Sequence, residues 1–389
     1  MNEVVLNDIC ELIVDCPHST AYDEGTGYPL VRTPNIGRGR LIYSGMHRVC
    51  EEVYNRRNAR AIPQTNDLIF AREATAGNVA LIQEGEKVCL GQRTVLIRPN
   101  ANLVNPAFLT YYLLAPEQQY KLLSTANGAT VAHVNMPTIR NLKLSLPDLP
   151  TQHRIATILS RYDSLIENYQ KQIKLLEEAA QRLYKEWFID LRFPGHGNIK
   201  IIDGVPEGWE KKKLIDLVNV QYGYAFDGHL FNSKGEGTPI VRIRNIPDGY
   251  TNDYTTEEAN ESYIVNDGDI LIGMDGIFHI NTWCGGKAYL VQRACSFRPK
   301  DVSMKGFILQ AIFEPIKFFE NTVVGATVAH LGKKHIDSIE LLVSNDDKMY
   351  KPFEKMFNER QTLKTQLRLL TEARDRLLPK LMSGEIDVQ

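Results

Sequence analysis

Arginine is concentrated in one part of this chain, between Arg32 and Arg72. The span holds eight arginines, no lysine and three acidic residues, a local charge of +5, and it is interleaved with glycine, asparagine and tyrosine (NIGRGRLIYSG). The planar guanidinium fork suits bidentate contact with phosphates and guanine edges. We interpret the span as a nucleic-acid contact surface, and the alternative is a solvated loop with surface ion pairs. The candidate contacts here and in the following strand are Arg32, Asn35, Arg38, Arg40, Arg56, Arg57, Arg72 and Arg93.

The second half of the chain is less basic. Residues 198–344 contain 15 basic and 19 acidic residues, so a nucleic-acid surface there requires a local stripe. A repeated arginine within a β-rich run, such as Arg32 and Arg242, is equally compatible with a structural ion pair. The candidate contacts in this half are Arg242, Arg244, Asn245, Lys287, Arg293, Lys333 and Lys334.

The hexapeptide GATVAH occurs twice, at Gly128–His133 and at Gly325–His330. Its polar side chains, Thr130 and His133 in one copy and Thr327 and His330 in the other, can hydrogen-bond phosphate oxygens. The competing interpretation is structural, because glycine permits backbone conformations that other residues resist, and such residues often fix a turn or cap the next helix.

The sequence contains no nucleotide-binding phosphate loop, zinc-protease motif, nucleophile elbow or dinucleotide fingerprint. The nearest pattern to a nuclease is Asp203 with Glu210, Lys211 and Lys212, an acid followed by Glu-x-Lys, which would hold a magnesium ion. Acids and lysines at such spacing are also common in charged linkers. A Mg-dependent nuclease is therefore an unfavoured alternative, and we expect no metal site.

The repeated hexapeptide belongs to a longer internal duplication. PLVRTPNI (Pro29–Ile36) matches PIVRIRNI (Pro239–Ile246), and LGQRTVLIRP (Leu90–Pro99) matches LVQRACSFRP (Leu290–Pro299). LLEEAAQRLYK (Leu175–Lys185) matches LLTEARDRLLP (Leu369–Pro379). These and the other matched pairs follow one another in the same order, as expected for a duplication with loop insertions.

Each copy combines a β-rich segment with a long helix. Short β-branched runs broken by Gly, Asn and Pro predict strands, and one helix is expected in each copy, around Phe108–Leu123 and Phe307–Phe319. Apolar residues then recur in steps of three and four from Ile158 through Leu165 to Trp187, and again from Phe353 to Leu381 with Arg360 and Arg374 in the series. This spacing is typical of a coiled-coil seam. At Trp187 and Phe188 we favour packing over base stacking.

The predicted fold is therefore α+β, with two β-rich domains separated by two long helices that pair as an antiparallel coiled coil. The predicted boundaries are 1–147 for the first domain, 148–192 for the central helix, 193–344 for the second domain and 345–389 for the C-terminal helix.

Bulk composition bounds the class of protein. The six cysteines are scattered without a Cys-x-x-Cys pair, which favours free thiols in a reducing compartment. The N-terminus lacks the basic start and apolar run of a signal peptide, and no stretch has the length of a membrane span, so we expect a cytoplasmic protein. The net charge of −2 is low for a nucleic-acid binder but allows a local basic patch.

Four motifs around the long helices are specific. They are VPEGWEKKKLIDL (Val205–Leu217), GATVAH followed by LKLSLPDLPTQHRIATILSRYDSLI (Leu142–Ile166), LYKEWFIDLRFPG (Leu183–Gly195) and RLLPKLMSGEIDV (Arg376–Val388). With the duplication, they resemble the specificity (S) subunits of type I restriction-modification systems, and the resemblance covers essentially the whole chain. The chain departs from the family pattern in the N-terminal copy, which lacks the Pro-Glu-Gly-Trp opening, and in the second helix, which lacks the Glu-Trp-Phe ending.

The resemblance implies a non-enzymatic subunit acting in host defence and DNA methylation. Its two target recognition domains would each bind half of a bipartite site in double-stranded DNA. Its helices would separate the halves and dock two methyltransferase subunits, with restriction/translocase subunits joining for cleavage. It implies no cofactor on this chain, since S-adenosylmethionine, ATP and Mg belong to the partners. A coiled-coil adaptor that binds proteins through its globular ends is the alternative.

The two copies differ where DNA would be read. GRGRLIYSGMHRVCEEVYNRRNAR in the first copy does not resemble PDGYTNDYTTEEANESY in the second. Different segments on equivalent scaffolds predict two unlike half-sites and an asymmetric target. Helices of about 35–40 residues are about 50–60 Å long, which predicts half-sites separated by about one and a half turns of DNA. The near-neutral charge predicts weak, salt-sensitive DNA binding by the chain alone.

Overall fold

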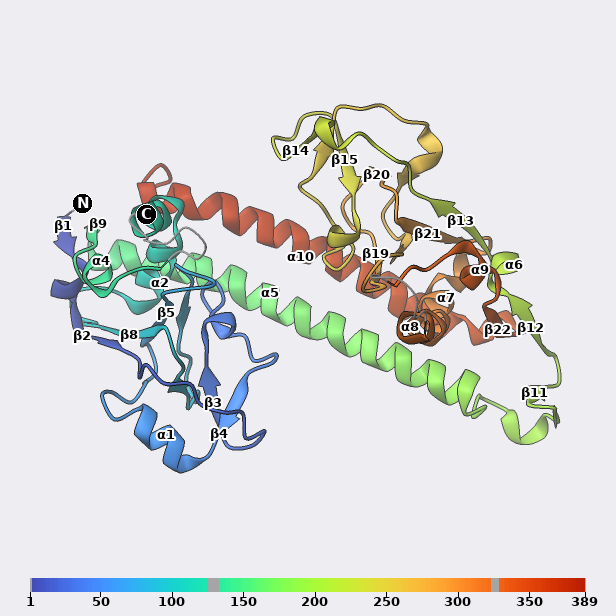
Figure 1. The fold of residues 1–389 in the computed structure, drawn as a ribbon, viewed down its shortest axis with the longest axis horizontal. Helices are drawn as coiled ribbons and strands as arrows, with labels where there is room; N and C mark the ends of the chain where they lie inside the picture. The colour runs from blue at the N-terminus through green and yellow to red at the C-terminus, as the bar shows by residue number, and fades with distance from the viewer. Residues whose placement is uncertain (1, 125–132, 323–328, 389) are drawn as a thin grey trace. The chain divides into compact units, whose positions relative to one another are not determined.

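The computed structural model describes residues 2–124, 133–322 and 329–388, and contacts divide the chain into two compact units (Figure 1). Unit 1 contains Met1–Leu165 with Thr371–Gln389, and unit 2 contains Ile166–Leu370. Two long helices, α5 (Leu149–Tyr184) and α10 (Lys351–Ser383), each contribute to both units. A π-helical turn, Lys185–Ile189, ends α5 close to the predicted FPGHGN stop.

The β-rich part of unit 1 consists of small sheets. One pairs β1 (Asn2–Val5) with β9 (Lys143–Leu146) and so joins the two ends of this segment. A four-stranded sheet has the order β2-β8-β5-β6, and a three-stranded sheet has the order β4-β3-β7. Their strands are β2 (Cys10–Asp15), β3 (Tyr28–Val31), β4 (His47–Val49), β5 (Leu68–Ala71), β6 (Val79–Leu81), β7 (Cys89–Leu90) and β8 (Thr94–Pro99).

Unit 2 repeats this plan with additions. The pair β12–β22 corresponds to β1–β9, and the order β13-β21-β18-β19 corresponds to β2-β8-β5-β6. The order β14-β16-β15-β20-β17 extends the three-stranded sheet, and β10–β11 is an extra hairpin. The strands are β10 (Ile201–Ile202), β11 (Val205–Pro206), β12 (Trp209–Lys213), β13 (Val218–Tyr222), β14 (Phe231–Asn232), β15 (Thr238–Val241), β16 (Tyr254–Thr255), β17 (Ile264–Val265), β18 (Ile270–Gly273), β19 (Ile280–Thr282), β20 (Ala288–Leu290), β21 (Ala294–Pro299) and β22 (Glu340–Ser344).

Strand register confirms the internal duplication. The parallel pair β3–β7 aligns Leu30 with Cys89, and the parallel pair β15–β20 aligns Ile240 with Tyr289. All other named strand pairs in the described residues are antiparallel. A single parallel ladder at the same place in each unit is the topology expected from two copies of one sequence.

The prediction of a single helix inside each copy is wrong, because the structure has a pair of short helices there. Unit 1 has α2 (Pro106–Leu114) and α3 (Pro116–Ser124), and unit 2 has α7 (Lys305–Ala311) and α8 (Phe313–Thr322). In unit 1 the break falls at Ala115, which is extended because the residue before a proline avoids the helical region. The remaining short helices are α1 (Glu51–Arg57), α4 (Met136–Arg140), α6 (Leu214–Leu217) and α9 (Lys333–Asp337).

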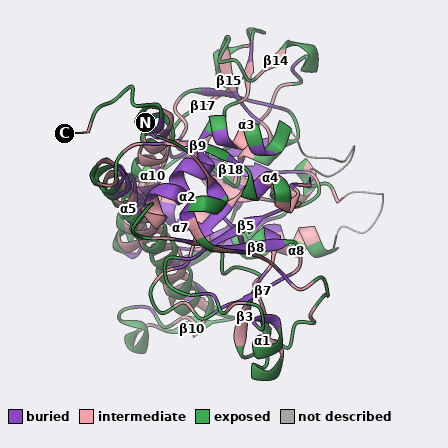
Figure 2. Cartoon of the chain, turned by 90° about the vertical axis from the view of Figure 1, so that its left-hand side faces the viewer, coloured by how far each residue is buried: buried purple, intermediate pink, exposed green. Residues whose placement is uncertain are grey.

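The inner helix of each pair lies in the core of its unit. Residues 108–114 of α2 are all buried, and they pack with β5 and β8 in a cluster that includes Phe70, Val95 and Ile97 (Figure 2). In unit 2, Phe307 and Ile308 of α7 pack with Ile270, Ile272 and Phe297 in the same way. Because α2 is apolar around its whole circumference, it is stable only when it is covered on all sides.

The two long helices run antiparallel in each unit. In unit 1, Ile155 and Leu159 of α5 share a core with Leu378 and Leu381 of α10. In unit 2, the C-terminal end of α5 packs on the N-terminal half of α10. Phe188 stacks on Tyr350, and Trp187 meets Phe353 edge to face at a centroid distance of 6.1 Å. These contacts confirm the predicted pairing and the packing role of Trp187 and Phe188.

The predicted seam of α5 is shifted from the observed one. The apolar spacing predicts Leu165 in the seam, but this residue is 44% exposed, whereas Asp163 and Ile166 are buried. A pattern based on apolar residues cannot select a buried carboxylate, and Asp163 is buried because Arg374 neutralises it. The prediction that Arg360 and Arg374 lie in the seam is confirmed. Arg360 is 8% exposed and pairs with Glu177.

Within the described residues, no helix is both long enough and apolar enough to cross a membrane.

Candidate nucleic-acid interface

The two predicted asparagines support the turns that follow equivalent strands. After β3, Asn35 Oδ1 accepts a hydrogen bond from the Arg32 backbone N–H at 3.2 Å, and after β15, Asn245 Oδ1 accepts one from the Arg242 N–H at 2.9 Å. Asn35 is 1% exposed, and its amide donates to the Ile42 carbonyl at 3.1 Å. The prediction that Asn35 contacts DNA does not fit this burial, since its side chain is used to hold the turn.

The arginines of these two turns are half-buried. Arg32 Nη2 donates to the Gly45 carbonyl at 3.1 Å, and the Arg242 guanidinium lies over the Phe231 ring at 5.4 Å from its centroid. Arg32 Nε is buried without a hydrogen-bond partner among the described atoms. Among the described residues, neither Arg32 nor Arg242 forms an ion pair, so the structural ion pair given as the alternative is not found in that part of the chain. One ion pair that is repeated in both units joins Arg98 to Asp67 and Arg298 to Asp269.

The remaining arginines of the basic span separate into different environments. Arg38 donates to the Leu114 carbonyl at the end of α2 at 3.0 Å, and the segment that carries Arg38 and Arg40 lies beside the long helices of unit 1. Arg56 is exposed on α1 and lies 4.0 Å from Glu52. Arg57, its neighbour, is 5% exposed. The span is therefore not one continuous basic face.

Arg57 is a structural residue. Its Nε donates to the Leu90 carbonyl at 2.6 Å, and Nη1 donates to the Ser19 carbonyl at 3.0 Å. Burial lowers the pKa of the guanidinium below its ordinary value, although arginine stays charged. A buried cation whose donors are occupied by main-chain carbonyls holds loops together, so the predicted DNA contact does not fit Arg57.

Arg72, Arg93 and His133 meet in one ion-pair cluster of unit 1. Arg72 is 9% exposed; its Nη1 donates to Asp15 Oδ2 at 2.8 Å, and its Nη2 lies 2.9 Å from His133 Nε2. His133 Nδ1 lies 2.5 Å from Glu73 Oε1, and Glu73 also pairs with Arg93. Arg72 is enclosed by this cluster, whereas the Arg93 side chain is 55% exposed at its edge.

Unit 2 has an equivalent, simpler cluster. Arg293 Nη1 lies 2.9 Å from Asp275 Oδ2, and Asp275 Oδ1 lies 2.5 Å from His330 Nδ1. The Arg293 and His330 side chains are 68% and 59% exposed. Lys333 and Lys334 follow on α9 and are exposed. Thr130 and Thr327, the other predicted residues of the hexapeptide, lie outside the described residues.

Two predicted residues of unit 2 lie away from that cluster. Arg244 is 61% exposed and forms a bidentate pair with Asp253, with Nη2 2.6 Å from Oδ2. Burial raises the pKa of Asp253, but hydrogen bonds from Arg244 and Asn245 outweigh it, so the pKa is lowered. Lys287 is exposed just before β20, at the opposite end of that strand from Arg293.

Sequence reasoning missed the acidic residues of these clusters. Asp15, Glu73, Asp253 and Asp275 hold predicted arginines or histidines, but a search for basic residues gives acids no weight. The sequence did contain a signal for two of these acids. Glu73 and Asp275 each stand two residues after the equivalent strands β5 and β18, so the duplication itself relates them.

The residues of the nuclease alternative do not gather into a site. Lys212 Nζ pairs with Glu210 Oε1 at 2.8 Å on exposed side chains of β12, and Asp203 is in the turn of the β10–β11 hairpin. No group of three or more His, Cys, Asp or Glu in the described part of the chain has metal-binding geometry.

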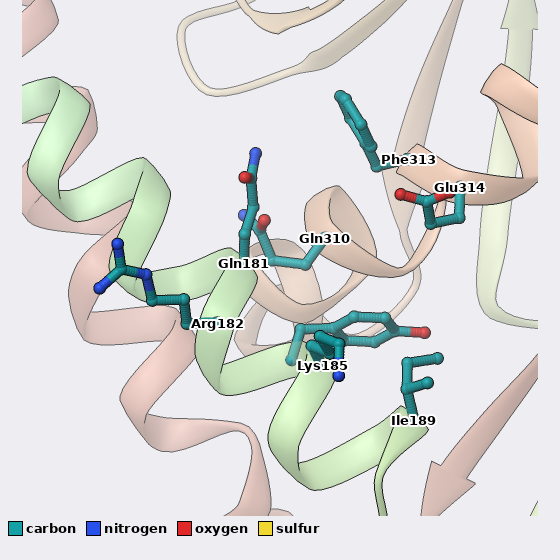
Figure 3. A pocket seen from close by; sticks show the side chains of 8 residues that line it. Gln181, Arg182, Lys185, Ile189, Gln310, Phe313 and Glu314 are labelled. Atoms are coloured by element: carbon teal, nitrogen blue, oxygen red, sulfur yellow. The ribbon is translucent and has the colours of Figure 1, made fainter.

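A cavity of about 500 Å³ lies in unit 2 between the C-terminal end of α5 and the α7–α8 pair (Figure 3). Gln181, Lys185 and Ile189 approach it from the α5 side, and Gln310, Phe313 and Glu314 approach it from the other. None of the predicted nucleic-acid contacts lines this cavity.

Comparisons with known proteins place this geometry in one family. The family model described as "Type I restriction modification DNA specificity domain" matches residues 1–178 and 206–368. The MjaIX specificity subunit of Methanocaldococcus jannaschii, a type I restriction enzyme subunit, is 25% identical and the match covers 99% of this chain and 93% of that protein. The HindI specificity subunit of Haemophilus influenzae is 22% identical, with 75% and 80% covered. The crystal structure of the type I S subunit from M. genitalium has the same fold, with a TM-score of 0.60 at 16% identity and 100% and 96% coverage.

Proposed function

This chain belongs to the family of type I restriction modification DNA specificity domains, and from that membership we propose that it is the DNA sequence-specificity subunit of a type I restriction-modification complex. In this role it is not itself an enzyme. It binds a double-stranded DNA target, and methylation and cleavage are carried out by the subunits that assemble on it.

The duplication supports a target in two halves. Each unit has the same four-stranded sheet order and the same parallel strand pair, so each offers an equivalent scaffold. The segments inserted between the framing strands differ. Residues 37–60 contain β4 and α1, whereas residues 247–263 contain β16 and end in a short 3-10 turn, Glu261–Tyr263. Equivalent scaffolds with different inserted segments favour two unlike half-sites.

The charged clusters support contact with DNA in both units. The side chains of Arg56, Arg93, Arg244 and Arg293 are each more than half exposed, as is needed for phosphate or base contact. The proposed contact set therefore keeps these four residues, with Arg32, Arg38, Arg40, Arg242, Asn245, Lys287, Lys333, Lys334, His133 and His330 beside them.

Partners and cofactors complete the proposal. Two methyltransferase subunits dock along α5 and α10, and restriction/translocase subunits join them. S-adenosylmethionine, ATP and Mg are bound by those subunits and not by this chain. Docking along two antiparallel helices is supported by the internal repeat, because a duplicated chain offers two similar surfaces to two copies of one partner.

A methylome of the host with and without this gene tests the proposal. We expect a split motif with two unlike halves to be methylated in the wild type and unmethylated in the deletion strain. Exchange of residues 1–147 for those of a relative should change one half of the motif and leave the other half unchanged. An unchanged methylome, together with no DNA binding by the chain mixed with its methyltransferase, would contradict the proposal.

A further inference from the structure

The two units share an arginine–carboxylate–histidine triad in the same arrangement. In unit 1 it consists of Arg93, Glu73 and His133, and in unit 2 it consists of Arg293, Asp275 and His330. In each triad one carboxylate oxygen pairs with the arginine and the other lies 2.5 Å from the histidine Nδ1.

Backbone hydrogen bonds position both triads identically. The N–H before each acid, that of Arg72 or Met274, donates to the carbonyl of the triad arginine at 3.0 or 2.9 Å. The N–H after each histidine, that of Val134 or Leu331, donates to the carbonyl of Arg72 or Met274 at 3.0 or 2.7 Å. The arrangement therefore does not depend on the side chains that differ between the units.

The backbone of both arginines is strained. Arg93 has a φ of 66° and Arg293 a φ of 68°, in the left-handed region that favours glycine. Only six described residues other than glycine have a positive φ, and two of them are these equivalent arginines. Glycine would remove the strain at either position, so the arginine side chain must contribute something that glycine does not.

The side chains are directed outward over the carboxylates. The arginines are 55% and 68% exposed, and the acids beneath them are 16% and 17% exposed. A guanidinium has five donors in a fixed fork, so an arginine that binds a carboxylate on one edge still presents donors to an anion.

From these observations, and resting on the proposed function, we infer that Arg93 and Arg293 each bind a backbone phosphate of the DNA target, held in place by Glu73 and Asp275. The two units carry different inserted segments and so read different bases, but they share the triads. A feature common to both units matches the feature common to both half-sites, which is the sugar–phosphate backbone. The triads set the position of each domain on the duplex without specifying sequence.

The test uses the full chain with its methyltransferase subunits and a 40-base-pair duplex of random sequence. Arg93→Gly and Arg293→Gly should each weaken binding and reduce the slope of log affinity against log salt by about one, and the double variant by about two. Neither substitution should lower the melting temperature, because glycine relieves the strain. Asn66→Gly makes the matching change to glycine at a φ of 72° outside the triads and should leave the slope unchanged.

A second pair of variants tests the role of the carboxylate. Glu73→Asp keeps the charge but shortens the side chain, and it should weaken binding when Arg93 is present and have no effect in the Arg93→Gly background. A purely structural role for Glu73 would change stability in both backgrounds and binding in neither.

The outcomes separate this inference from the proposed function. If the wild-type complex binds the duplex and the double glycine variant keeps the full salt slope, the inference is overturned and the proposed function stands. If the glycine variants lose affinity for one of two duplexes of unrelated sequence and not for the other, these arginines read bases and the inference is also overturned. A wild-type complex without affinity for any duplex overturns both.

Discussion

The buried Asp163 on α5 and the half-buried Arg374 on α10 form an ion pair in unit 1, with 2.9 Å between Asp163 Oδ1 and Arg374 Nη1. The Tyr111 hydroxyl donates to the other carboxylate oxygen at 2.5 Å. Burial lowers the pKa of Arg374, but hydrogen bonds to Asp163 and Asp375 outweigh it, so the pKa is raised. The pair fixes the register of the two helices, because a slip of one turn would separate the buried Asp163 carboxylate from the Arg374 guanidinium, which would keep only Asp375 of its own helix.

Removal of one member of this pair should destabilise the protein. We expect Asp163→Asn and Arg374→Met each to lower the free energy of unfolding by about 3 kcal/mol. The double variant should cost less than the sum, since no uncompensated charge remains. Denaturant unfolding in a double-mutant cycle measures the coupling. The exposed pair Glu178–Arg182, 3.7 Å apart, is the control and should couple by less than about 0.5 kcal/mol. Equal coupling in both cycles would refute a register role.

Lys364 should make stability depend on pH. Its Nζ is buried against β19, where it donates to the Thr282 carbonyl at 2.6 Å and to Asn281 Oδ1 at 2.8 Å. Burial and the nearby Arg360 lower its pKa to about 7, and Cys284, Glu177 and Asp248 partly offset this. The folded protein therefore binds fewer protons than the unfolded chain between pH 7 and the ordinary lysine pKa of 10.5.

It follows that the contribution of Lys364 to stability rises with pH above 7 and is constant below it. The free energy of unfolding of the wild type should rise relative to that of Lys364→Met by up to about 1.4 kcal/mol for each pH unit between 7 and 10. Urea unfolding of the wild type and of Lys364→Met at pH 6, 7, 8 and 9 gives this difference. The contributions of other titrating groups cancel because they are present in both proteins. A difference that is constant from pH 6 to 9 would show that Lys364 keeps its ordinary pKa.

Much of the architecture is predictable because the sequence contains an internal duplication. Most framing motifs of one copy have a counterpart in the other, so the matched strands, the two domains and the long helices follow from aligning the copies. The seam arginines Arg360 and Arg374 were also predictable, since they interrupt an otherwise apolar series at the correct spacing. The spacing of residues along a helix can be read from the sequence alone, without knowledge of what each side chain contacts.

The site was less predictable because charge alone does not reveal burial. Arg56 and Arg57 are adjacent residues of the same type, yet Arg56 is exposed, whereas Arg57 is buried and donates hydrogen bonds to main-chain carbonyls. The acids that hold Arg93, Arg244 and Arg293 belong to other strands or loops, and only the folded chain brings them together. The register of α5 was missed for the same reason, since Asp163 is buried only because Arg374 reaches it.

Gly306 should tolerate no larger residue. It is the second residue of α7, and a Cβ there would lie 2.2 Å from the Phe353 carbonyl oxygen of α10. The backbones of the two helices must therefore separate if a methyl group is added. We expect Gly306→Ala to lower the free energy of unfolding by about 2 kcal/mol through overpacking. Gly228→Ala, with nothing within 4 Å of the added Cβ, is the matched control. Equal melting temperatures for the two variants would show that α7 can shift without cost.

Arg57 and Arg56 offer a final test of which arginines maintain the fold. Arg57→Met leaves the Leu90 and Ser19 carbonyls without their donor, and we expect a loss of about 2 kcal/mol in the free energy of unfolding. Arg56→Met removes only a 4.0 Å contact with Glu52 and should change stability by less than about 0.5 kcal/mol. DNA binding by the two folded variants should change in the opposite sense, with the larger loss for Arg56→Met, because only Arg56 is exposed enough to contact phosphate.

Thermal unfolding measures the stability of the two variants, and a salt titration of duplex binding measures their affinity for DNA. If Arg57→Met weakens DNA binding at temperatures where it is fully folded, the assignment of Arg57 to structure alone is wrong.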